Sequence, residues 1–279
     1  MTVQRHERTK MIQTGKNPLL PVRTYGTAPF SLVLVHGGPG VAGEMAALAA
    51  GLSPGRGILE PMQTATSVAG QITELEAAIE TLGHRPVILV GFSWGAWLSL
   101  MVAARYHASV RKLILIGCGP FEEDLSARVL ENRLNRLEEG DRAAFISDLL
   151  ILSDPDETAK DAVLARLGTL VAKTDSLDPI QETVPEEIHY RGDIFQKVWE
   201  EASEMRRTGE LLNLAAQVTC PVVAIHGDSD PHPAEGVRNP LKTILKDFQF
   251  ILLKNCGHKP WIERQARGEF FRILNQEWT

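Results

Sequence analysis

The sequence predicts an α/β protein with a mostly parallel, eight-stranded sheet flanked by helices. Short apolar runs rich in Val, Ile and Leu alternate with longer runs of helical periodicity. Glycine-rich polar segments follow several apolar runs, at the strand ends where such sheets bind their ligands. Between residues 121 and 215 only helical patterns continue. We therefore expect a core of residues 1–120 and 216–279, with residues 121–215 inserted as a helical cap before the seventh strand.

The expected strands are short and apolar, and the first two form an antiparallel edge beside a parallel remainder. They are expected at 10–14, 22–25, 31–36, 57–60, 86–90, 113–117, 222–226 and 248–253. Helices covering the sheet are expected at 67–82, 94–106 and 261–276. Within the inserted block, helices are expected at 125–139, 141–152, 157–174 and 194–210.

The most informative segment is Gly-Phe-Ser-Trp-Gly at 91–95, between an apolar strand and an apolar helix. A serine at a sharp strand-to-helix turn has a strained backbone, and only glycine tolerates the crowding on either side. Two glycines around a serine also occur by chance, but the flanking strand and helix favour a nucleophile elbow. The segment therefore predicts Ser93 as a nucleophile, which needs a base, an orienting acid and oxyanion donors.

The expected donors lie in the loop His-Gly-Gly-Pro-Gly at 36–40, which follows the strand at 31–35. Glycines let a backbone approach a ligand closely, and Pro39 has no N–H to donate. Gly37, Gly38 and Gly40 remain possible donors. We favour Gly38, paired with the N–H of Trp94, the residue after the nucleophile. The alternative is a glycine-rich turn without a catalytic role.

The expected acid and base follow the last two strands. Asp228 and Asp230 lie in the segment after the strand at 220–225, and His258 follows the strand at 248–253. His258 would take the proton of Ser93, and the aspartate would hold its other ring nitrogen. We favour Asp230, which lies farther beyond the strand end, over Asp228, which could instead bind the backbone of its own turn.

The same segment allows a metal site as an alternative. His226, Asp228, Asp230 and His232 alternate, and on an extended strand they would share one face. Pro231 and the proline after His232 interrupt such a strand. We therefore expect neither a metal ion nor a cofactor.

Composition narrows the class of protein further. The 279 residues are 44% hydrophobic, with a net charge of −6, so nucleic acid is not an expected partner. No stretch of eighteen apolar residues occurs, which argues against a membrane-spanning helix. The first ten residues are charged, and Cys118, Cys220 and Cys256 show no paired spacing. We expect a cytoplasmic protein with reduced thiols that acts on a small molecule; no oligomeric state is predicted.

Taken together, the segments at 36–40 and 91–95, Gly227-x-x-Asp230 and Gly257-His258 resemble the α/β-hydrolase superfamily. The likeness is nearest to the prolyl iminopeptidase-like branch, where HGGPG and GxSWG occur together. It covers about residues 20–120 and 216–279, and it implies a Ser93–Asp230–His258 triad. Those peptidases usually carry a D-x-R-G-x-G-x-S turn, and in the corresponding turn at 52–58 its leading acid and its trailing serine are missing.

The sequence is therefore compatible with three functions. The first is a serine hydrolase that cleaves small carboxylic esters through an acyl-enzyme. The second is a proline iminopeptidase-type aminopeptidase, in which Glu200, Glu201 or Glu204 would hold the substrate amine. Residues 121–215 contain 22 acidic and 11 basic residues, which either attract cationic substrates or are solvated helix faces. The third is a small-molecule receptor without catalysis.

Overall fold

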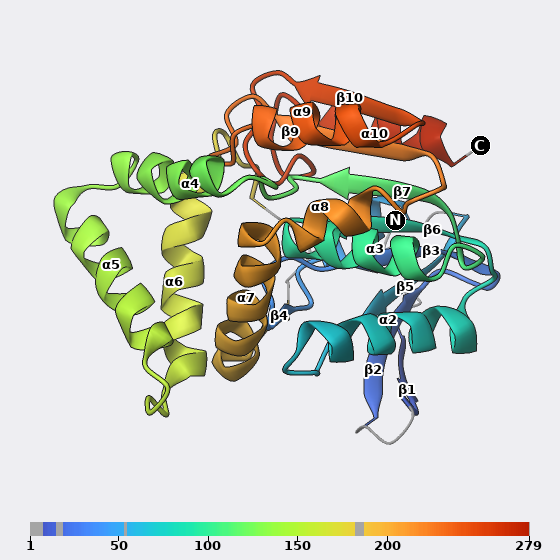
Figure 1. Cartoon of the computed structure of the whole chain (residues 1–279), viewed down its shortest axis with the longest axis horizontal. Coiled ribbons are helices and arrows are strands. Elements are labelled where there is room, and N and C mark those ends of the chain that lie inside the picture. The colour runs from blue at the N-terminus through green and yellow to red at the C-terminus, as the bar shows by residue number, and fades with distance from the viewer. Residues whose placement is uncertain (1–7, 15–18, 53–54, 182–186, 279) are drawn as a thin grey trace.

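An eight-stranded sheet forms the centre of the structure, a computed structural model that describes residues 8–14, 19–52, 55–181 and 187–278 (Figure 1). The strand order is β1-β2-β5-β3-β6-β7-β9-β10. β2 pairs antiparallel with β1 and β5, and the remaining pairs are parallel, which confirms the expected sheet and its antiparallel edge. The strands are β1 (Arg8–Ile12), β2 (Leu20–Tyr25), β3 (Phe30–Val35), β5 (Gly57–Pro61), β6 (Val87–Phe92), β7 (Val110–Ile116), β9 (Val222–Gly227) and β10 (Phe248–Leu253).

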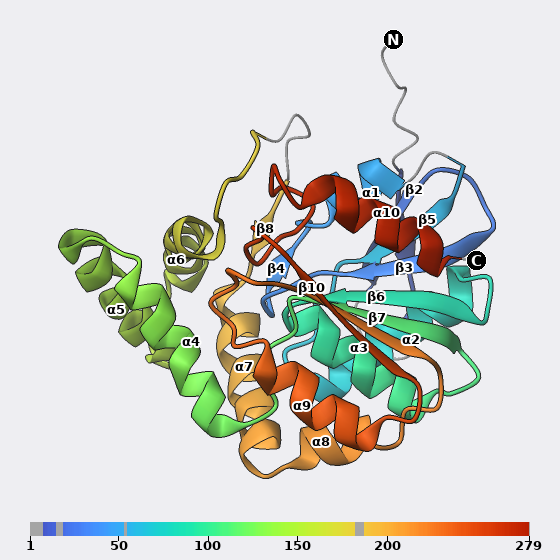
Figure 2. The same ribbon diagram turned by 90° about the horizontal axis from the view of Figure 1, so that it is seen from above.

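The central strands are buried on both faces, which explains their unbroken apolar sequences. Along β3, Val33 and Val35 face the helices α2, α3, α8 and α9, whereas Leu32 and Leu34 face α1 and α10 (Figure 2). Each face of the sheet therefore has its own apolar core. These helices are α1 (Ala46–Leu52), α2 (Val68–Leu82), α3 (Trp94–Arg105), α8 (Glu210–Ala215), α9 (Glu235–Ile244) and α10 (Arg267–Glu277).

Besides α8, which is described below, three of these helices differ from the sequence prediction. The sequence predicts neither α1, which contains a glycine, nor α9, which contains Pro240, because their formation depends on packing rather than on local preference. The predicted helix at 261–276 begins only at Arg267. Ahead of it, the Glu263 carboxylate accepts the backbone N–H groups of Leu177 and Asp178, and this contact holds the segment in turns.

Between β7 and β9 the chain forms five helices, α4 to α8, which we call the inserted helices. α4 to α6 lie to one side of the sheet (Figures 1 and 2). The predicted helix at 194–210 is broken at Gly209, whose φ of 79° ends one helix and starts the next. The inserted helices whose bounds have not yet been given are α4 (Glu123–Asn135), α5 (Glu139–Ser153), α6 (Lys160–Asp175) and α7 (Gly192–Arg207).

A short ribbon ties the inserted helices to the sheet. β4 (Val41–Ala42) follows the glycine-rich loop and pairs antiparallel with β8 (His189–Tyr190), a pairing too short for the sequence to predict. Ser53 and Pro54, in the turn at 52–58, and the first seven residues lie outside the described part of the chain. Among the described residues, no helix is both long enough and apolar enough to cross a membrane.

Candidate active site

Ser93 lies at the sharp turn between β6 and α3, and its backbone is strained. Its φ of 52° and ψ of −115° fall outside the regions that L-residues ordinarily adopt. Glycine is required on both sides: a Cβ on Gly91 would overlap the backbone of Gly95, and a Cβ on Gly95 would overlap the carbonyl of Val35. The turn brings Ser93 into the wall of a cavity at the carboxyl ends of the strands.

The loop after β3 lies in the same wall. Gly37 donates its N–H to Oε1 of Glu44 at 2.7 Å and is therefore already engaged. Gly40 packs against the backbone of the chain that leads into α7. Gly38, with a φ of 29°, lines the cavity together with Trp94. Trp94 is the first residue of α3, where backbone N–H groups have no acceptor within the helix. Both residues favoured from the sequence as donors thus line the same cavity as Ser93.

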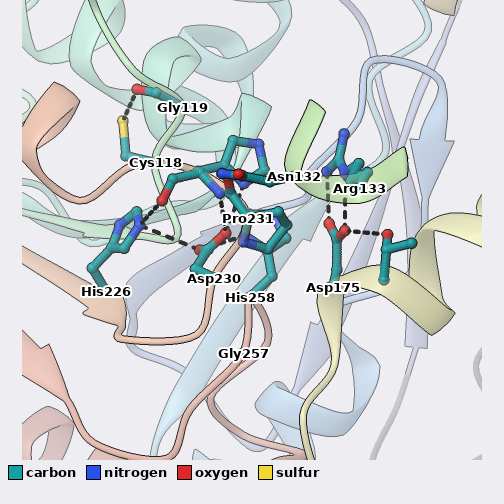
Figure 3. A network of polar contacts seen from close by, with 12 residues as sticks. Cys118, Gly119, Asn132, Arg133, Asp175, His226, Asp230, Pro231, Gly257 and His258 are labelled. Carbon is teal, nitrogen blue, oxygen red and sulfur yellow. Dashed lines mark hydrogen bonds and ion pairs between the residues drawn. The ribbon is translucent and has the colours of Figure 1, made fainter. Parts of the chain in front are cut away.

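The structure brings His258 and Asp230 into direct contact. Nδ1 of His258 lies 2.7 Å from Oδ2 of Asp230 (Figure 3). Because a carboxylate only accepts hydrogen bonds, this contact places the proton on Nδ1 and leaves Nε2 as a proton acceptor. Asp228 instead accepts the backbone N–H of Cys256 at 3.2 Å. Asp230, the aspartate favoured from the sequence, is therefore the one that contacts the histidine.

A glycine at the end of β7 makes room for the histidine ring. Gly117 has a φ of 52°, and a Cβ there would lie 2.8 Å from Nδ1 of His258. On another side the ring of Phe92 lies 4.8 Å from that of His258, measured between centroids. The position of His258 is thus fixed by the sheet as well as by Asp230.

Asp230 is buried among three histidines. Oδ1 accepts the backbone N–H of His232 at 2.9 Å and faces its Nδ1 at 2.8 Å, and His226 Nε2 lies 3.5 Å from Oδ2. Burial alone would raise the pKa of Asp230, but His258, His226 and His232 outweigh it and hold the pKa well below its usual range. Burial lowers the pKa of His232 to about 4 against the opposing charge of Asp230, so His232 is neutral at pH 7.

Two further residues support His258, and the sequence does not single them out. The carbonyl of Asp175, the last residue of α6, accepts the backbone N–H of His258 at 2.7 Å. Its carboxylate accepts Nε and Nη2 of Arg133, on α4, at 2.9 and 2.6 Å (Figure 3). Burial alone would raise the pKa of Asp175, but Arg133 lowers it below its ordinary value. Both residues come from the inserted helices, where no motif could have indicated them.

One cluster of an acidic residue and two histidines brings possible metal ligands together. Asp175, His232 and His258 each offer one ligand atom within 4.8 Å of the others. The Asp175 carboxylate already binds Arg133, and the rings of His232 and His258 are stacked at 4.4 Å with 21° between their planes. Stacked rings direct their lone pairs side by side rather than toward a common centre. The four alternating residues considered as metal ligands from the sequence do not converge on one point either. Asp228 turns away from the other three and accepts the backbone N–H of Cys256.

The cavity has a volume of about 580 Å³ and is mostly apolar. The polar floor contributes Ser93, His258 and Gly38, and α4 to α7 contribute the roof. Each of the five charged side chains in the wall has an ionic partner within the described residues. The pairs are Glu44–Lys259 at 2.9 Å, Arg133–Asp175 at 2.6 Å, and Arg206 with Glu123, outside the wall, at 2.9 Å. Apolar roof residues are Val129, Leu130, Phe145, Leu149, Leu164, Leu167, Val171, Phe195 and Trp199.

The three glutamates expected to bind a substrate amine lie elsewhere. Glu201 accepts the backbone N–H of Val68 at 2.8 Å and so stabilises the start of α2. Glu204 pairs with Arg207 on the surface, and Glu200 is exposed. None of the three is part of the cavity wall described above, so we assign them no role in substrate binding.

The fold and this site define the class, and the sequence comparison agrees with it. The chain belongs to the alpha/beta hydrolase family, whose sequence model matches residues 32–273. No functionally curated protein sequence matches the chain.

Similar solved structures include three hydrolases. E-2-(acetamidomethylene)succinate hydrolase is 20% identical with a TM-score of 0.63, and 98% of each chain is covered. Proline iminopeptidase from Mycobacterium smegmatis is 18% identical with a TM-score of 0.61, and 97% of each chain is covered. 2-Hydroxy-6-oxo-6-phenylhexa-2,4-dienoate hydrolase from a Rhodococcus species is 16% identical with a TM-score of 0.63, and 99% of each chain is covered. At these identities the likeness demonstrates the fold alone.

Proposed function

We propose that the protein is a serine hydrolase that cleaves small, uncharged carboxylic esters. The observation that carries this proposal is the placement of a strained serine and an aspartate-bound histidine in the wall of one apolar cavity. Ser93 is the nucleophile, His258 the base and Asp230 the acid that orients it. Gly38 and Trp94 are the oxyanion donors.

The reaction proceeds through an acyl-enzyme. Nε2 of His258 takes the hydroxyl proton of Ser93 as Oγ attacks the ester carbonyl, and Asp230 stabilises the resulting imidazolium. The N–H groups of Gly38 and Trp94 stabilise the negative oxygen of the tetrahedral intermediate. The alcohol leaves with the proton from His258. Water, deprotonated by the same histidine, then releases the carboxylic acid and restores Ser93.

The charges in the cavity favour a neutral ester over a substrate with a free amine. An amine needs an available carboxylate, but Glu44 is paired with Lys259 and Asp175 with Arg133. Displacing either cation would leave it poorly compensated in a mostly apolar wall. We therefore place the esterase ahead of the aminopeptidase.

The inserted helices act in this proposal as a cap. Residues 121–215 cover the site, while residues 1–120 and 216–279 form the hydrolase core that carries the triad. We further propose a cytoplasmic location, which is consistent with the three free cysteines.

The proposal is tested with a fluorophosphonate probe and a panel of short acyl esters and amino-acid amides. We expect labelling at Ser93, ester hydrolysis, and loss of both in Ser93→Ala, whose fold should be retained because the cavity wall accepts a smaller side chain. Hydrolysis of the amides alone would favour the aminopeptidase. Binding of panel members without labelling or turnover would favour the non-catalytic receptor, and labelling that persists in Ser93→Ala would exclude Ser93 as the nucleophile.

A further inference from the structure

We propose that the ester cleaved at Ser93 carries an aromatic ring, which binds against a wall formed by Trp97, Phe195 and Trp199 (the aromatic wall). The inference rests on the proposed function, because it names the substrate class of the same cavity. Three observations support it: the concentration of aromatic residues in the cavity, the stacking of three of their rings, and the contacts that Trp97 already makes.

Aromatic residues are concentrated in this cavity. The chain contains nine Phe, five Trp and three Tyr, only 6% of its residues. Seven of them line the cavity, in contact with the space that also borders Ser93 and His258. A pocket for an aliphatic chain needs only apolar volume, which Leu, Ile and Val supply. Concentrating the rarer aromatic residues adds a specific preference for other π-systems.

Three of these rings form a nearly parallel series. Trp97, on α3, stacks with Trp199, on α7, at 6.0 Å between ring centroids and 8° between planes. Trp199 in turn stacks with Phe195, four residues earlier on the same helix, at 6.3 Å between ring centroids and 6° between planes. Residues four apart on a helix share a face, so α7 presents both rings to the same side. The wall therefore joins the sheet-covering helix α3 to the inserted helix α7.

The contacts that fix the orientation of Trp97 also satisfy its indole N–H, so a ligand need not supply a hydrogen-bond acceptor for it. Its Nε1 donates to the carbonyl of Gly119 at 3.1 Å, and a Cβ on Gly119 would lie 3.0 Å from the indole. The Arg206 guanidinium lies 5.7 Å from the ring centroid and is itself paired with Glu123. A ligand group beside Trp97 is therefore selected by its π-system and shape rather than by a hydrogen bond to this indole.

Trp199 is the accessible member of the wall. It is 38% exposed, whereas Trp97 is 2% exposed. A large side chain left partly open at a cavity gains most from a ligand that covers it. Trp199 can therefore be substituted at low cost to the fold, which makes it the position for testing the inference.

The test uses ester pairs that differ only in whether a six-membered ring is aromatic or saturated. Methyl phenylacetate is compared with methyl cyclohexylacetate, and benzyl acetate with cyclohexylmethyl acetate, by titrating the acid released. The first pair places the ring in the acyl part and the second in the alcohol part. We expect kcat/KM to favour the aromatic member of at least one pair by roughly two- to tenfold, the range of aromatic pair contacts beyond area burial.

Variants assign the preference to the wall. Trp199→Leu should bring the ratio close to one, and Trp199→Phe should retain most of it. Trp278→Leu is the matched control, since it also removes a tryptophan, but one that packs under Arg56 at 5.7 Å. This control should keep the wild-type ratio. A ratio that falls equally in Trp199→Leu and Trp278→Leu would contradict a specific role for the wall.

A binding measurement separates this inference from the proposed function. N-benzylacetamide and N-(cyclohexylmethyl)acetamide are titrated into Ser93→Ala by calorimetry, so no turnover is needed. Tighter binding of the benzyl compound supports the inference even if no ester is hydrolysed, an outcome that would reject only the proposed function. Ester hydrolysis with equal or better use of the saturated member of both pairs, and no tighter binding of the benzyl amide, would overturn the aromatic preference and leave the hydrolase proposal intact.

Discussion

The polar floor and the apolar roof of the cavity are held by different kinds of contact. In the floor, directional bonds fix individual groups: Asp230 bonds His232 and His258, and His258 is also held through its backbone by Asp175. In the roof, apolar side chains of α5 and α6 form a hydrophobic cluster of their own, which includes Phe145, Leu164 and Leu167. The floor is thus intolerant of single-atom changes, whereas the roof depends on apolar volume and can change shape without loss of the floor.

The glycines illustrate the same contrast. A Cβ on Gly95, in the floor, would overlap backbone atoms, while a Cβ on Gly140, in α5, would meet nothing within 4 Å. Close packing lets the floor specify one geometry. We therefore expect floor substitutions to lower kcat and roof substitutions to change which substrate is preferred.

The largest expected effect concerns the acid. Asp230→Asn should lower kcat by on the order of 10⁴, because the amide no longer fixes His258 in the tautomer that accepts a proton. Asp228→Asn is the matched control two residues away, and its contact with the Cys256 backbone should make its effect far smaller. The comparison is made by steady-state kinetics on one ester. If Asp228→Asn proves the more damaging, the acid has been assigned to the wrong residue.

The second effect concerns the ion pair within the roof, between Arg133 on α4 and Asp175 on α6. Asp175→Asn leaves Arg133 without its charged partner and should reduce the free energy of unfolding by about 3 kcal/mol at pH 7. The lowered pKa of Asp175 means that its contribution is complete above its unfolded pKa, about 3.9, and is lost as the pH falls below that value.

The stability difference between wild type and Asp175→Asn should therefore stay constant from pH 7 to about pH 4 and narrow between about pH 4 and pH 2. Urea unfolding at several pH values measures it. A difference that stays constant over this lower range as well would show that the carboxylate charge of Asp175 does not stabilise the fold.

The third effect compares a crowded glycine beside His258 with an uncrowded glycine in the roof. Gly117→Ala places a methyl group 2.8 Å from the His258 ring at a positive φ and should lower kcat on the order of 10²-fold by displacing the base. Gly140→Ala, in the roof, should leave kcat unchanged and stabilise the helix by up to about 1 kcal/mol. Kinetics and thermal unfolding of both variants test the contrast. Equal activity losses would remove the distinction between floor and roof.

Much of the floor could be predicted from the sequence, because its residues lie in short turns and at strand ends that need particular neighbouring residues. The turn around Ser93 needs glycines at fixed positions, so a five-residue motif indicated it. Asp230 and His258 follow strands whose apolar runs are easily recognised. The sequence favoured Asp230 over Asp228, but both can turn toward a histidine from the same loop, and only the structure shows which one contacts His258.

The roof could not be predicted in the same way. Its helices were anticipated, but which faces point into the cavity depends on how helices distant in sequence pack together. Glu201 illustrates this: it was expected to bind a substrate and instead stabilises the start of α2. Arg133 and Asp175 were missed for the same reason, since an ion pair between α4 and α6 leaves no local signal.

The smallest expected effect concerns the acidic surface of the inserted helices. Glu200 and Glu204 are exposed, so their field on the cavity is screened over about 8–10 Å at 0.1 M ionic strength and above. The variant with Glu200, Glu201 and Glu204 all changed to Gln should shift the kcat/KM ratio of an amine-bearing ester to its neutral isostere by less than about twofold at low salt. At 0.5 M salt the shift should vanish, because only long-range attraction is involved. A large shift that survives high salt would instead mean that a glutamate touches the amine in the bound state. That result would require α7 to turn its outer face toward the cavity and would move the aminopeptidase ahead of the esterase.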